Sequence, residues 1–343
     1  MTRAAVLDAP RQLSVVDRAS QAPGRHEARV RIAATAVCHA DLEIYTGRHP
    51  GVRYPVIMGH ESAGIVEEVG PDVTRVRPGQ GVVVNPIAEC GTCDCCARGQ
   101  GYLCRRAGLM GRELPGSLAD HMIVAETHLQ PFPDALSPSV ATLIETLATV
   151  RHAQERARVG PGESVVVLGQ GTTGLMHTQL ARLSGALPVI AVSRSASKLA
   201  MARRMKADHV VDAGRQDVVA AVLAITDGRG ADLVIDSAGA PELMRPAVEM
   251  LRPGGRLLVY GISNRTVPDF TMFPMYMKEL TLIGSRALTS ADLEAATRLI
   301  AGGAIDVDGF ISGSYPLEAA ATAFAEYERA PEAILRLVIG PGR

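Results

Sequence analysis

SVVVLGQGTTG, residues 164–174, is the stretch that decides the fold of this chain. A run of β-branched and apolar residues leads into the pattern G-x-G-x-x-G. Beyond it, Met176, Leu180 and Leu183 recur at i, i+4 and i+7 before Gly185, which is the spacing of one helix face. The stretch therefore predicts a strand, a tight turn and the start of a helix.

The glycines of this turn indicate a phosphate-binding role. Gly169 and Gly171 let the backbone turn sharply and approach a pyrophosphate, and Gly174 lets the helix pack closely on the strand. The free N–H groups of the first helical turn, at Thr172 and Thr173, then face the phosphates. A lone G-x-G-x-x-G also occurs in strand-helix turns that bind no nucleotide, but the strand and helix around this one favour a dinucleotide.

Strands and helices continue to alternate after the turn. We expect strands at 188–192, 209–212, 232–236, 256–261 and 280–284, and helices such as 197–205 and 241–251. About six parallel strands with right-handed crossovers fit the order 3-2-1-4-5-6 of a Rossmann sheet. Residues after these strands are candidates to line a nicotinamide, ordinary loop chemistry being the alternative: Asp236, Ala238, Gly239, Gly261 and Ser263.

The choice of cofactor depends on the end of the second strand. An NAD-binding chain usually presents a carboxylate about 20 residues after the glycine turn, but here none occurs between Glu163 and Asp208. The expected position holds Ser193, Arg194 and Ser195, followed by Lys198. A guanidinium, two hydroxyls and a helix N-terminus suit a 2'-phosphate, so we favour NADP over NAD. The alternative is that Arg194 and Lys198 are only a solvated face.

The first 145 residues have a different pattern. Short alternating segments, punctuated by Gly and Pro, predict a small antiparallel barrel or partly open sheet. The segments are 4–7, 13–16, 28–34, 65–69 and 82–84.

A cluster of cysteines follows these segments. Cys90, Cys93, Cys96 and Cys104 give the spacing C-x2-C-x2-C-x7-C, which suits a closed tetrahedral zinc site that stabilises its loop. Cys95 is left over, and we expect it to be a small packed thiol. The alternative for the cluster is a disulfide knot, which a reducing compartment disfavours.

A sparser set of metal-ligand residues lies upstream. Cys38, Asp41, His60 and Glu61 supply a thiolate, an imidazole and two carboxylates. Taken singly, Cys38 would be a core cysteine and His60 a satisfied histidine. Together with the four-cysteine loop and the dinucleotide turn, however, the motifs Cys38-x-x-Asp41 and Gly59-His60-Glu61-x-x-Gly64 resemble those of the zinc-containing medium-chain dehydrogenase/reductase family.

That resemblance implies a catalytic zinc. Cys38 and His60 would hold it, with either Glu61 or Glu145 completing the protein ligands, and Asp41 would orient His60. Glu145 stands where liver-type alcohol dehydrogenases have cysteine, as in polyol, threonine and secondary-alcohol members. The alternative is an acidic residue near a helix N-terminus.

Two positions depart from the family pattern. Many members carry Ser or Thr two positions after the ligand cysteine and His three further on, as a route for the alcohol proton. This chain has Ala40 and Glu43 there. The proton must therefore leave by another route, such as a water chain to Glu43, His39 or Glu145.

The resemblance also implies the domain arrangement. We expect a GroES-like β-barrel catalytic domain of residues 1–146 and 285–343, and a Rossmann doubly wound parallel-sheet domain of residues 147–284, in an α/β chain. Helices at 291–300 and 317–330 and a last strand at 334–339 would return to the barrel. Tyr45, Met58 and Tyr276 are weak candidates for pocket walls.

Composition restricts the partners. The 343 residues are 47% hydrophobic with a formal net charge of -1, which argues against nucleic acid and anionic membranes. The N-terminal ten residues lack the apolar core of a signal peptide, and no apolar run approaches the ~20 residues of a membrane-spanning helix. We expect a cytoplasmic protein.

The sequence thus predicts a zinc-dependent oxidoreductase with two zinc ions per chain. It would interconvert a secondary alcohol, polyol or amino alcohol with its ketone or aldehyde, using NADP in preference to NAD, as a homodimer or homotetramer. One alternative is a nucleotide-binding redox sensor or structural subunit of the same fold that has lost turnover. Another is a zinc-free quinone or enoyl reductase.

Overall fold

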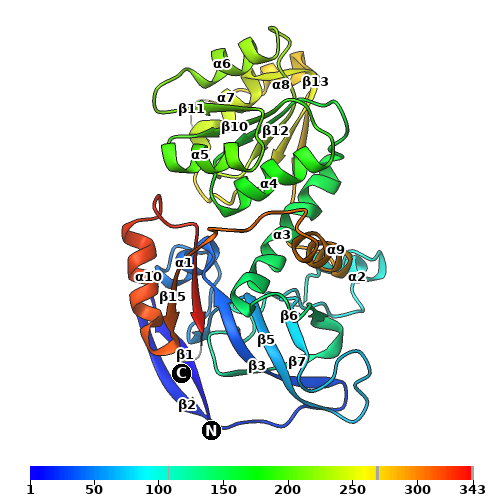
Figure 1. Ribbon diagram of the computed structural model, residues 1–343, viewed down its shortest axis with the longest axis vertical. Coiled ribbons are helices and arrows are strands. Elements are labelled where there is room, and N and C mark those ends of the chain that lie inside the picture. The colour runs from blue at the N-terminus through cyan, green and yellow to red at the C-terminus, as the bar shows by residue number, and fades with distance from the viewer. Residues whose placement is uncertain (107, 268–269, 341–343) are drawn as a thin grey trace. The chain divides into compact units, whose positions relative to one another are not determined.

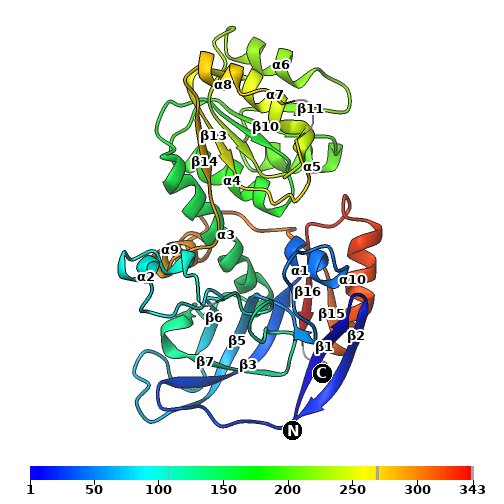
Figure 2. The ribbon, with the colours of Figure 1, turned by 180° about the vertical axis from the view of Figure 1, so that it is seen from behind.

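The computed structural model describes residues 1–106, 108–267 and 270–340, and the chain forms two compact units (Figures 1 and 2). The barrel unit comprises Met1–Ala148, Ala287–Gly303 and Val307–Arg343. The parallel-sheet unit comprises Thr149–Arg286 and Ala304–Asp306. Residues 107 and 341–343 of the predicted first domain, and residues 268–269 of the second, lie outside the described part of the chain.

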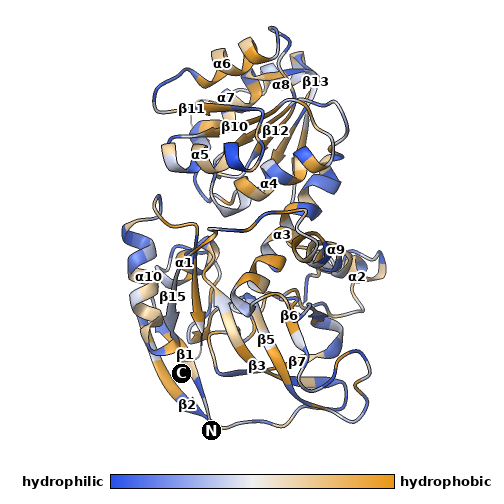
Figure 3. Cartoon of the chain, viewed as in Figure 1, coloured by the Kyte–Doolittle hydropathy of each residue, from blue (hydrophilic) through white to orange (hydrophobic). Residues whose placement is uncertain are grey.

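The parallel-sheet unit is built on six strands in the order β11-β10-β9-β12-β13-β14, which confirms the predicted order 3-2-1-4-5-6. The strands are β9 (Val165–Leu168), β10 (Val189–Ser193), β11 (His209–Asp212), β12 (Ala231–Asp236), β13 (Leu251–Val259) and β14 (Thr281–Gly284). Every neighbouring pair is parallel. All four side chains of β9 are buried, because this central strand is covered on both faces. Figure 3 shows β10 and β12 coloured mainly as hydrophobic.

Helices in this unit alternate with the strands. They are α4 (Thr172–Leu183), α5 (Ala196–Arg204), α6 (Val218–Ile225), η3 (Pro241–Leu243), α7 (Met244–Glu249) and α8 (Phe273–Met277). The predicted helix 241–251 has the wrong C-terminal boundary, and the predicted strand 256–261 has the wrong boundary at both ends. Helix α7 stops at Glu249, and β13 already begins at Leu251 because Leu251 pairs with Ala231 before the register shifts. Helix α6 was not predicted because its residues are all apolar, which leaves no helical periodicity to detect.

The barrel unit contains a seven-stranded sheet centred on β3, which pairs with β5, β7 and β16. A smaller sheet has the order β2-β1-β4. The strands are β1 (Thr2–Ala9), β2 (Gln12–Arg18), β3 (Glu27–Ala36), β4 (Val56–Ile57), β5 (Glu61–Val69), β6 (Gly81–Val84), β7 (His121–Ala125), β8 (Leu129–Pro131), β15 (Ile311–Pro316) and β16 (Arg336–Gly340). The pairs are antiparallel as predicted, except that β15 and β16 are parallel. The helix between them, α10, supplies the crossover that parallel strands require.

The helices of the barrel unit include the predicted returning segments. They are α1 (His39–Tyr45), α2 (Asp94–Ala97), η1 (Gly101–Leu103), η2 (Glu126–His128), α3 (Pro138–Ala157), α9 (Ser290–Ala301), η4 (Leu317–Ala319) and α10 (Ala320–Arg329). Helix α3 contains the boundary between the units, at Ala148 and Thr149. Tyr45 and Met58 belong to the buried core, where Tyr45 stacks on Phe324, so neither is a pocket wall. Within the described residues, no helix has both the length and the apolar character needed to cross a bilayer.

Candidate active site

The glycine turn joins β9 to α4 in the parallel-sheet unit. Gly169 has φ of 87°, a conformation that favours glycine. A Cβ on Gly174 would lie 1.9 Å from the carbonyl oxygen of Gly169, so only glycine allows helix and strand to approach this closely. Gly171 differs, because its φ is -74° and a Cβ there would meet nothing within 4 Å. Open space beside Gly171, at the start of a helix, is what an approaching phosphate requires.

Loops at the ends of β12 and β13 pack against this turn. The side-chain carboxylate of Asp236 accepts hydrogen bonds of 3.0 Å from the backbone N–H groups of Ala238 and Gly239. A Cβ on Gly169 would lie 3.0 Å from that of Ala238, and one on Gly261 only 2.2 Å from the nitrogen of Gly239. These residues therefore shape the loops around the turn. Ser263 is exposed and accepts a hydrogen bond from the Arg265 N–H.

The end of β10 presents hydroxyls and a cation beside a helix N-terminus. Ser193 ends β10, and its hydroxyl accepts a hydrogen bond from the Ser195 N–H. Ser195 is the N-cap of α5 and accepts from the backbone N–H of Lys198. No acidic residue lies in the first turn of α5. The charge of Arg194 also acts on a neighbouring loop. The pKa of Glu242 is lowered mainly by hydrogen bonds from its own backbone and from Arg265, and to a smaller extent by the charge of Arg194.

Three candidate zinc ligands come together in the barrel unit. The ligand atoms of Cys38, His60 and Glu61 all lie within 4.8 Å of one another. Strand pairing explains their proximity, because Ala36 at the end of β3 is opposite Glu61 at the start of β5. Cys38 then follows β3 by two residues, and His60 immediately precedes β5.

Asp41 links two of these ligands. One oxygen of its buried carboxylate is 3.1 Å from His60 Nδ1, and the other accepts a 3.0 Å hydrogen bond from the Cys38 N–H. Because a carboxylate only accepts, Nδ1 is the protonated nitrogen of the neutral ring, and it is Nε2 whose lone pair would bind a metal. Burial would lower the pKa of His60, but the charge and hydrogen bond of Asp41 outweigh it and raise that pKa well above the usual value.

Arg336, which the sequence did not single out, contacts the third ligand. Its guanidinium is 3.1 Å from Glu61 Oε1 and donates to the carbonyl of Val37 and the hydroxyl of Thr146. The other carboxylate oxygen, Glu61 Oε2, is buried with no hydrogen-bond partner among the described residues. Arg336 therefore fixes one oxygen of Glu61 and leaves the second free to bind a cation. The sequence signal for Arg336 was slight: one charged residue at the start of an apolar strand.

Glu145 lies on α3, outside the cluster of three ligand atoms but electrostatically coupled to it. Burial, together with the negative charge of Glu61, raises the pKa of Glu145 to about 8. Burial and Glu61 also raise the pKa of the Cys38 thiol. The site thus concentrates acidic groups whose negative charge a divalent cation would offset, and thiolate, imidazole and carboxylate are all zinc ligands.

The remaining predicted residues lie outside this cluster. The Glu43 carboxylate is 2.8 Å from Arg48 and 3.7 Å from His39 Nε2. His39 is largely exposed. The structure therefore does not bring Glu43 or His39 together with the three candidate ligands, and Tyr276 on α8 is exposed.

The four-cysteine loop forms a second cluster of ligand atoms within 4.8 Å of one another: Cys90, Cys93, Cys96 and Cys104. The Cys93 sulfur is 3.5 Å from that of Cys96 and 3.8 Å from that of Cys104, too far for disulfides. A hydrogen bond from the Thr92 backbone, with smaller contributions, lowers the pKa of Cys90 to about 5. The Cys90 thiol is therefore poised to ionise and bind a metal, whereas burial raises the pKa of Cys96 to about 12 in the absence of a metal. Cys95 is buried outside the cluster.

Comparison with known proteins places these sites in a family. Residues 24–134 match the alcohol dehydrogenase GroES-like domain, and residues 172–302 match the zinc-binding dehydrogenase domain. An L-threonine 3-dehydrogenase of Pyrococcus furiosus is 33% identical over 90% of this chain and 88% of its own length. The chain belongs to the zinc-type medium-chain alcohol/polyol dehydrogenase family. A second relative of this dehydrogenase, the D-arabitol-phosphate dehydrogenase of Enterococcus avium, is 30% identical over 89% of this chain and 88% of its own length.

Solved structures agree with this assignment. A zinc-binding dehydrogenase of Sinorhizobium meliloti bound to NADP superimposes with a TM-score of 0.92, 30% identity and 99% coverage of both chains. The predicted GroES-like and Rossmann folds are thereby confirmed. The dehydrogenase is an oxidoreductase of the zinc-binding, NAD(P)-dependent type that interconverts an alcohol and its carbonyl compound. Neither the non-catalytic sensor nor the zinc-free reductase is favoured.

Proposed function

We propose that this dehydrogenase oxidises a secondary hydroxyl group of a polyol or amino alcohol, reversibly, with NADP as the preferred cofactor and two zinc ions per chain. The observation that carries the proposal is the cluster of Cys38, His60 and Glu61, in which Glu61 keeps a buried, unpaired carboxylate oxygen. The closed set of four cysteines would hold the second ion, which stabilises the loop and does no chemistry.

The residues around the catalytic cluster have separate tasks in this mechanism. Cys38, His60 and Glu61 hold the metal, whose chemistry when bound is Lewis acidity toward an alcohol or carbonyl oxygen. Asp41 fixes the ring of His60, and Arg336 fixes the carboxylate of Glu61. We propose Glu145 as a direct or water-mediated contact of the same metal.

Glu145 is also the best supported of the three groups considered for the alcohol proton. It is buried beside the three candidate ligands, and in the absence of a bound metal burial and the charge of Glu61 raise its pKa to about 8. Glu43 is ion-paired with Arg48, and His39 is largely exposed. Ala40 offers no hydroxyl for a relay.

The substrate class is supported by Glu145 in place of cysteine and by the relatives. A D-arabitol-phosphate dehydrogenase, L-threonine 3-dehydrogenases and a sorbitol dehydrogenase are among them. These names describe compounds with several polar groups on a short carbon chain. We therefore extend to this chain the class of polyols and amino alcohols, without choosing one compound.

The cofactor preference rests on the end of β10. Ser193, Arg194, Ser195 and Lys198 offer hydroxyls and cations, with no carboxylate between Glu163 and Asp208 to repel a 2'-phosphate. The related S. meliloti structure binds NADP. The nicotinamide would lie near Ala238, Gly261 and Ser263, and its pyrophosphate against Gly169, Gly171, Thr172, Thr173 and Gly174.

We also propose a homodimer or homotetramer in the cytoplasm. The six cysteines are free thiols, which supports a reducing compartment. Strand β14 is a sheet edge next to exposed apolar side chains, which supports self-association.

One experiment tests the catalytic proposal. Zinc per chain is measured by mass spectrometry, and nicotinamide absorbance is followed with NADP and NAD against polyols, amino alcohols and ketones. We expect two zinc ions per chain and chelator-sensitive turnover. Cys38→Ser should lose one zinc and all turnover, whereas Cys95→Ala should keep both, because Cys95 lies outside the ligand cluster. Retention of two zinc ions and full turnover by Cys38→Ser would refute the proposal.

A further inference from the structure

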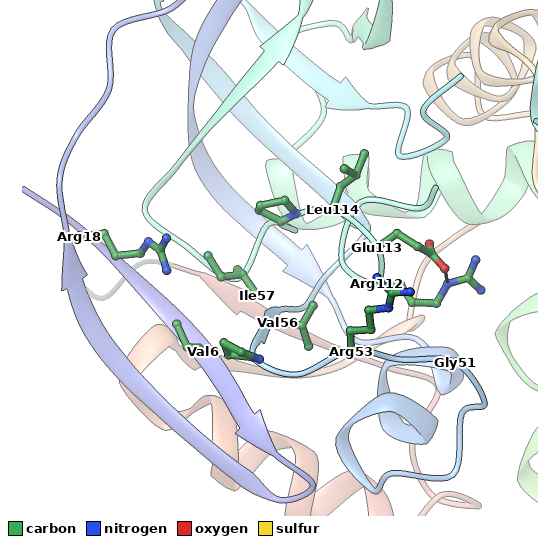
Figure 4. Close-up of a pocket in the computed structure, with 11 residues that line it drawn as sticks. Val6, Arg18, Gly51, Arg53, Val56, Ile57, Arg112, Glu113 and Leu114 are labelled. Atoms are coloured by element: carbon green, nitrogen blue, oxygen red, sulfur yellow. Dashed lines mark hydrogen bonds and ion pairs between the residues drawn. The ribbon is translucent and has the colours of Figure 1, made fainter. Parts of the chain in front are cut away.

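A pocket of about 600 Å³ lies in the barrel unit, between β1, the end of β2, β4 and the loop that contains Arg112 (Figure 4). None of the residues assigned above to zinc or to the nicotinamide cofactor lines it. Its volume is in the range of small-molecule sites. The proposed catalytic mechanism makes no use of this pocket.

The charged residues of the pocket are unbalanced. Its lining includes three arginines, Arg18, Arg53 and Arg112, against one carboxylate, Glu113. Arg112 is ion-paired with Glu113 at 2.5 Å. Arg18 and Arg53 have no carboxylate partner in the described part of the chain. Two guanidinium groups therefore remain available to an anion.

The two available guanidinium groups are separated by apolar surface. Figure 4 shows Arg18 on one side of the pocket and Arg53 with Arg112 on the other, with Val6, Val56 and Ile57 between them. Arg18 ends β2, whereas Arg53 lies in the loop between α1 and β4. The strand pairs of β1 with β2 and β4 hold this arrangement in place. A ligand that contacts both Arg18 and Arg53 must carry an anionic group at each end of a short, mainly apolar chain.

We propose that this pocket binds a small organic dianion, with one anionic group on Arg18 and the other on Arg53. Guanidinium groups bind carboxylates and phosphates through paired N–H donors, so either anion fits the chemistry. The apolar residues between them accommodate the carbon chain, as in most small-molecule sites. The site is separate from the zinc ligands, and its occupancy does not depend on turnover.

Calorimetric titration of the zinc-loaded, full-length chain tests the proposal. Saturating NADPH or NADH, whichever binds more tightly, fills the glycine turn so that it does not compete for anions. The probes are succinate, glutarate and adipate as dicarboxylates, glycerol 3-phosphate and inorganic phosphate as phosphates, and acetate as a monoanion, all at equal ionic strength. We expect one dicarboxylate length to bind at least tenfold more tightly than acetate, whereas glycerol 3-phosphate and inorganic phosphate, which carry a single anionic group, should bind more weakly than that dicarboxylate.

Variants locate the binding. Arg53→Gln should weaken dianion binding about fivefold, the scale of an exposed ion pair, and Arg18→Gln by a similar factor. Arg18 also lines a neighbouring pocket, but Arg53 does not, so Arg53→Gln is the decisive variant. Arg77→Gln, an exposed arginine that lines neither pocket, is the matched control and should bind normally.

Two results would overturn the proposal: dianions that bind no better than acetate, or equal losses in Arg53→Gln and Arg77→Gln. Melting temperatures of the variants show that each is folded. Repeating the titration with Cys38→Ser separates this site from the catalytic proposal. Binding should persist in that variant even if the enzyme's proposed substrate class is wrong.

Discussion

Buried charges at the cluster of candidate zinc ligands form one connected set of contacts. Arg336 and Glu61 are 4% and 3% exposed, so each charge offsets part of the free-energy cost of burying the other. Arg336 also bonds to the carbonyl of Val37, one residue before Cys38. The same arginine thus positions two of the three candidate zinc ligands.

A buried histidine outside the site gives a prediction on pH. His177, on α4, is fully buried, and burial lowers its pKa to about 3. Below about pH 6.5 the unfolded chain binds this proton and the folded chain does not. The neutral ring of His177 makes its full contribution to the free energy of unfolding above about pH 6.5. As pH falls toward 3 it is lost, at about 1.4 kcal/mol per pH unit.

His177→Met should therefore flatten the fall in stability between pH 6.5 and pH 4.5. The free energy of unfolding in urea, measured at several pH values, checks this expectation. His209→Gln, at an exposed histidine, is the control and should retain the original slope. If His177→Met and the parent chain lose stability in parallel, the inferred burial cost of a charged His177 is wrong.

Arg194 gives a prediction on cofactor choice. Arg194→Asp replaces a cation with an anion where the 2'-phosphate is expected, so affinity for NADP should fall at least tenfold. Affinity for NAD should change less than threefold. Arg203→Asp, on the exposed side of α5, should alter neither. Dissociation constants from cofactor fluorescence give the comparison, and equal losses for both cofactors would remove the argument for NADP.

Among single residues, the sequence could predict the site residues whose partners are close in the chain. The cysteine spacing, and the pairs Cys38–Asp41 and His60–Glu61, are local patterns. Arg336 could not be predicted, because its partner Val37 is 299 residues away and one arginine in a strand has many uses. Tyr45 and Met58 were misjudged as pocket walls for a similar reason, since their core neighbours include Phe324 and Leu337.

Two glycines in the turn between β9 and α4 are required for different reasons. Gly174 is needed for packing, since a Cβ there would lie 1.9 Å from a backbone oxygen. Gly171 is not needed for folding, since its φ is ordinary and the space beside it is open. If the dinucleotide binds as proposed, the motif combines a structural requirement at Gly174 with a binding requirement at Gly171.

Alanine substitutions separate these requirements. Gly174→Ala should destabilise the chain by about 3 kcal/mol or more, because strand and helix must move apart. Gly171→Ala should keep the parent melting temperature but weaken dinucleotide binding about tenfold, because its methyl group occupies the approach of the pyrophosphate. Melting curves and cofactor titrations of both variants test this. The interpretation fails if Gly171→Ala binds the cofactor normally.

Elements with a clear pattern were predicted, and those without one were not. The strands of the parallel sheet were evident because their central members are continuous apolar runs. Helix α6 is apolar throughout, and β15 (Ile311–Pro316) contains Gly, Ser and Pro, so neither matched a standard template. The sequence did predict the helix α10. Because this helix connects β15 to β16, the two strands can pair in parallel, but that pairing was not predicted.

At the scale of the molecule, the edge of the parallel sheet is the feature that supports the proposed self-association. Among the residues that the structure describes, strand β14 pairs only with β13, and Leu282 on it is 50% exposed. Nearby α8 exposes further large apolar side chains: Phe273, Tyr276 and Met277. An edge strand beside an apolar patch can pair with the same strand of a second copy across a two-fold axis.

Leu282→Lys should therefore shift the chain toward monomer, with a dimer dissociation constant raised at least tenfold. Leu183→Lys is a matched control, since Leu183 on α4 is 51% exposed but lies away from β14 in the sequence and on a different element. Sedimentation velocity over a concentration series measures both. A parent chain that sediments as a monomer throughout would contradict the proposed oligomer.

The position of β16 within its sheet has a consequence for biosynthesis. This strand lies between β15 and β3, and its residues, Arg336–Gly340, are made after those of the other described strands of the barrel unit. Until β16 has been made, the edge of β3 that pairs with it is unpaired, and Glu61 lacks its contact with the guanidinium of Arg336. During synthesis the parallel-sheet unit can therefore fold before Arg336 reaches Glu61, and the proposed metal site is completed only once β16 has been made.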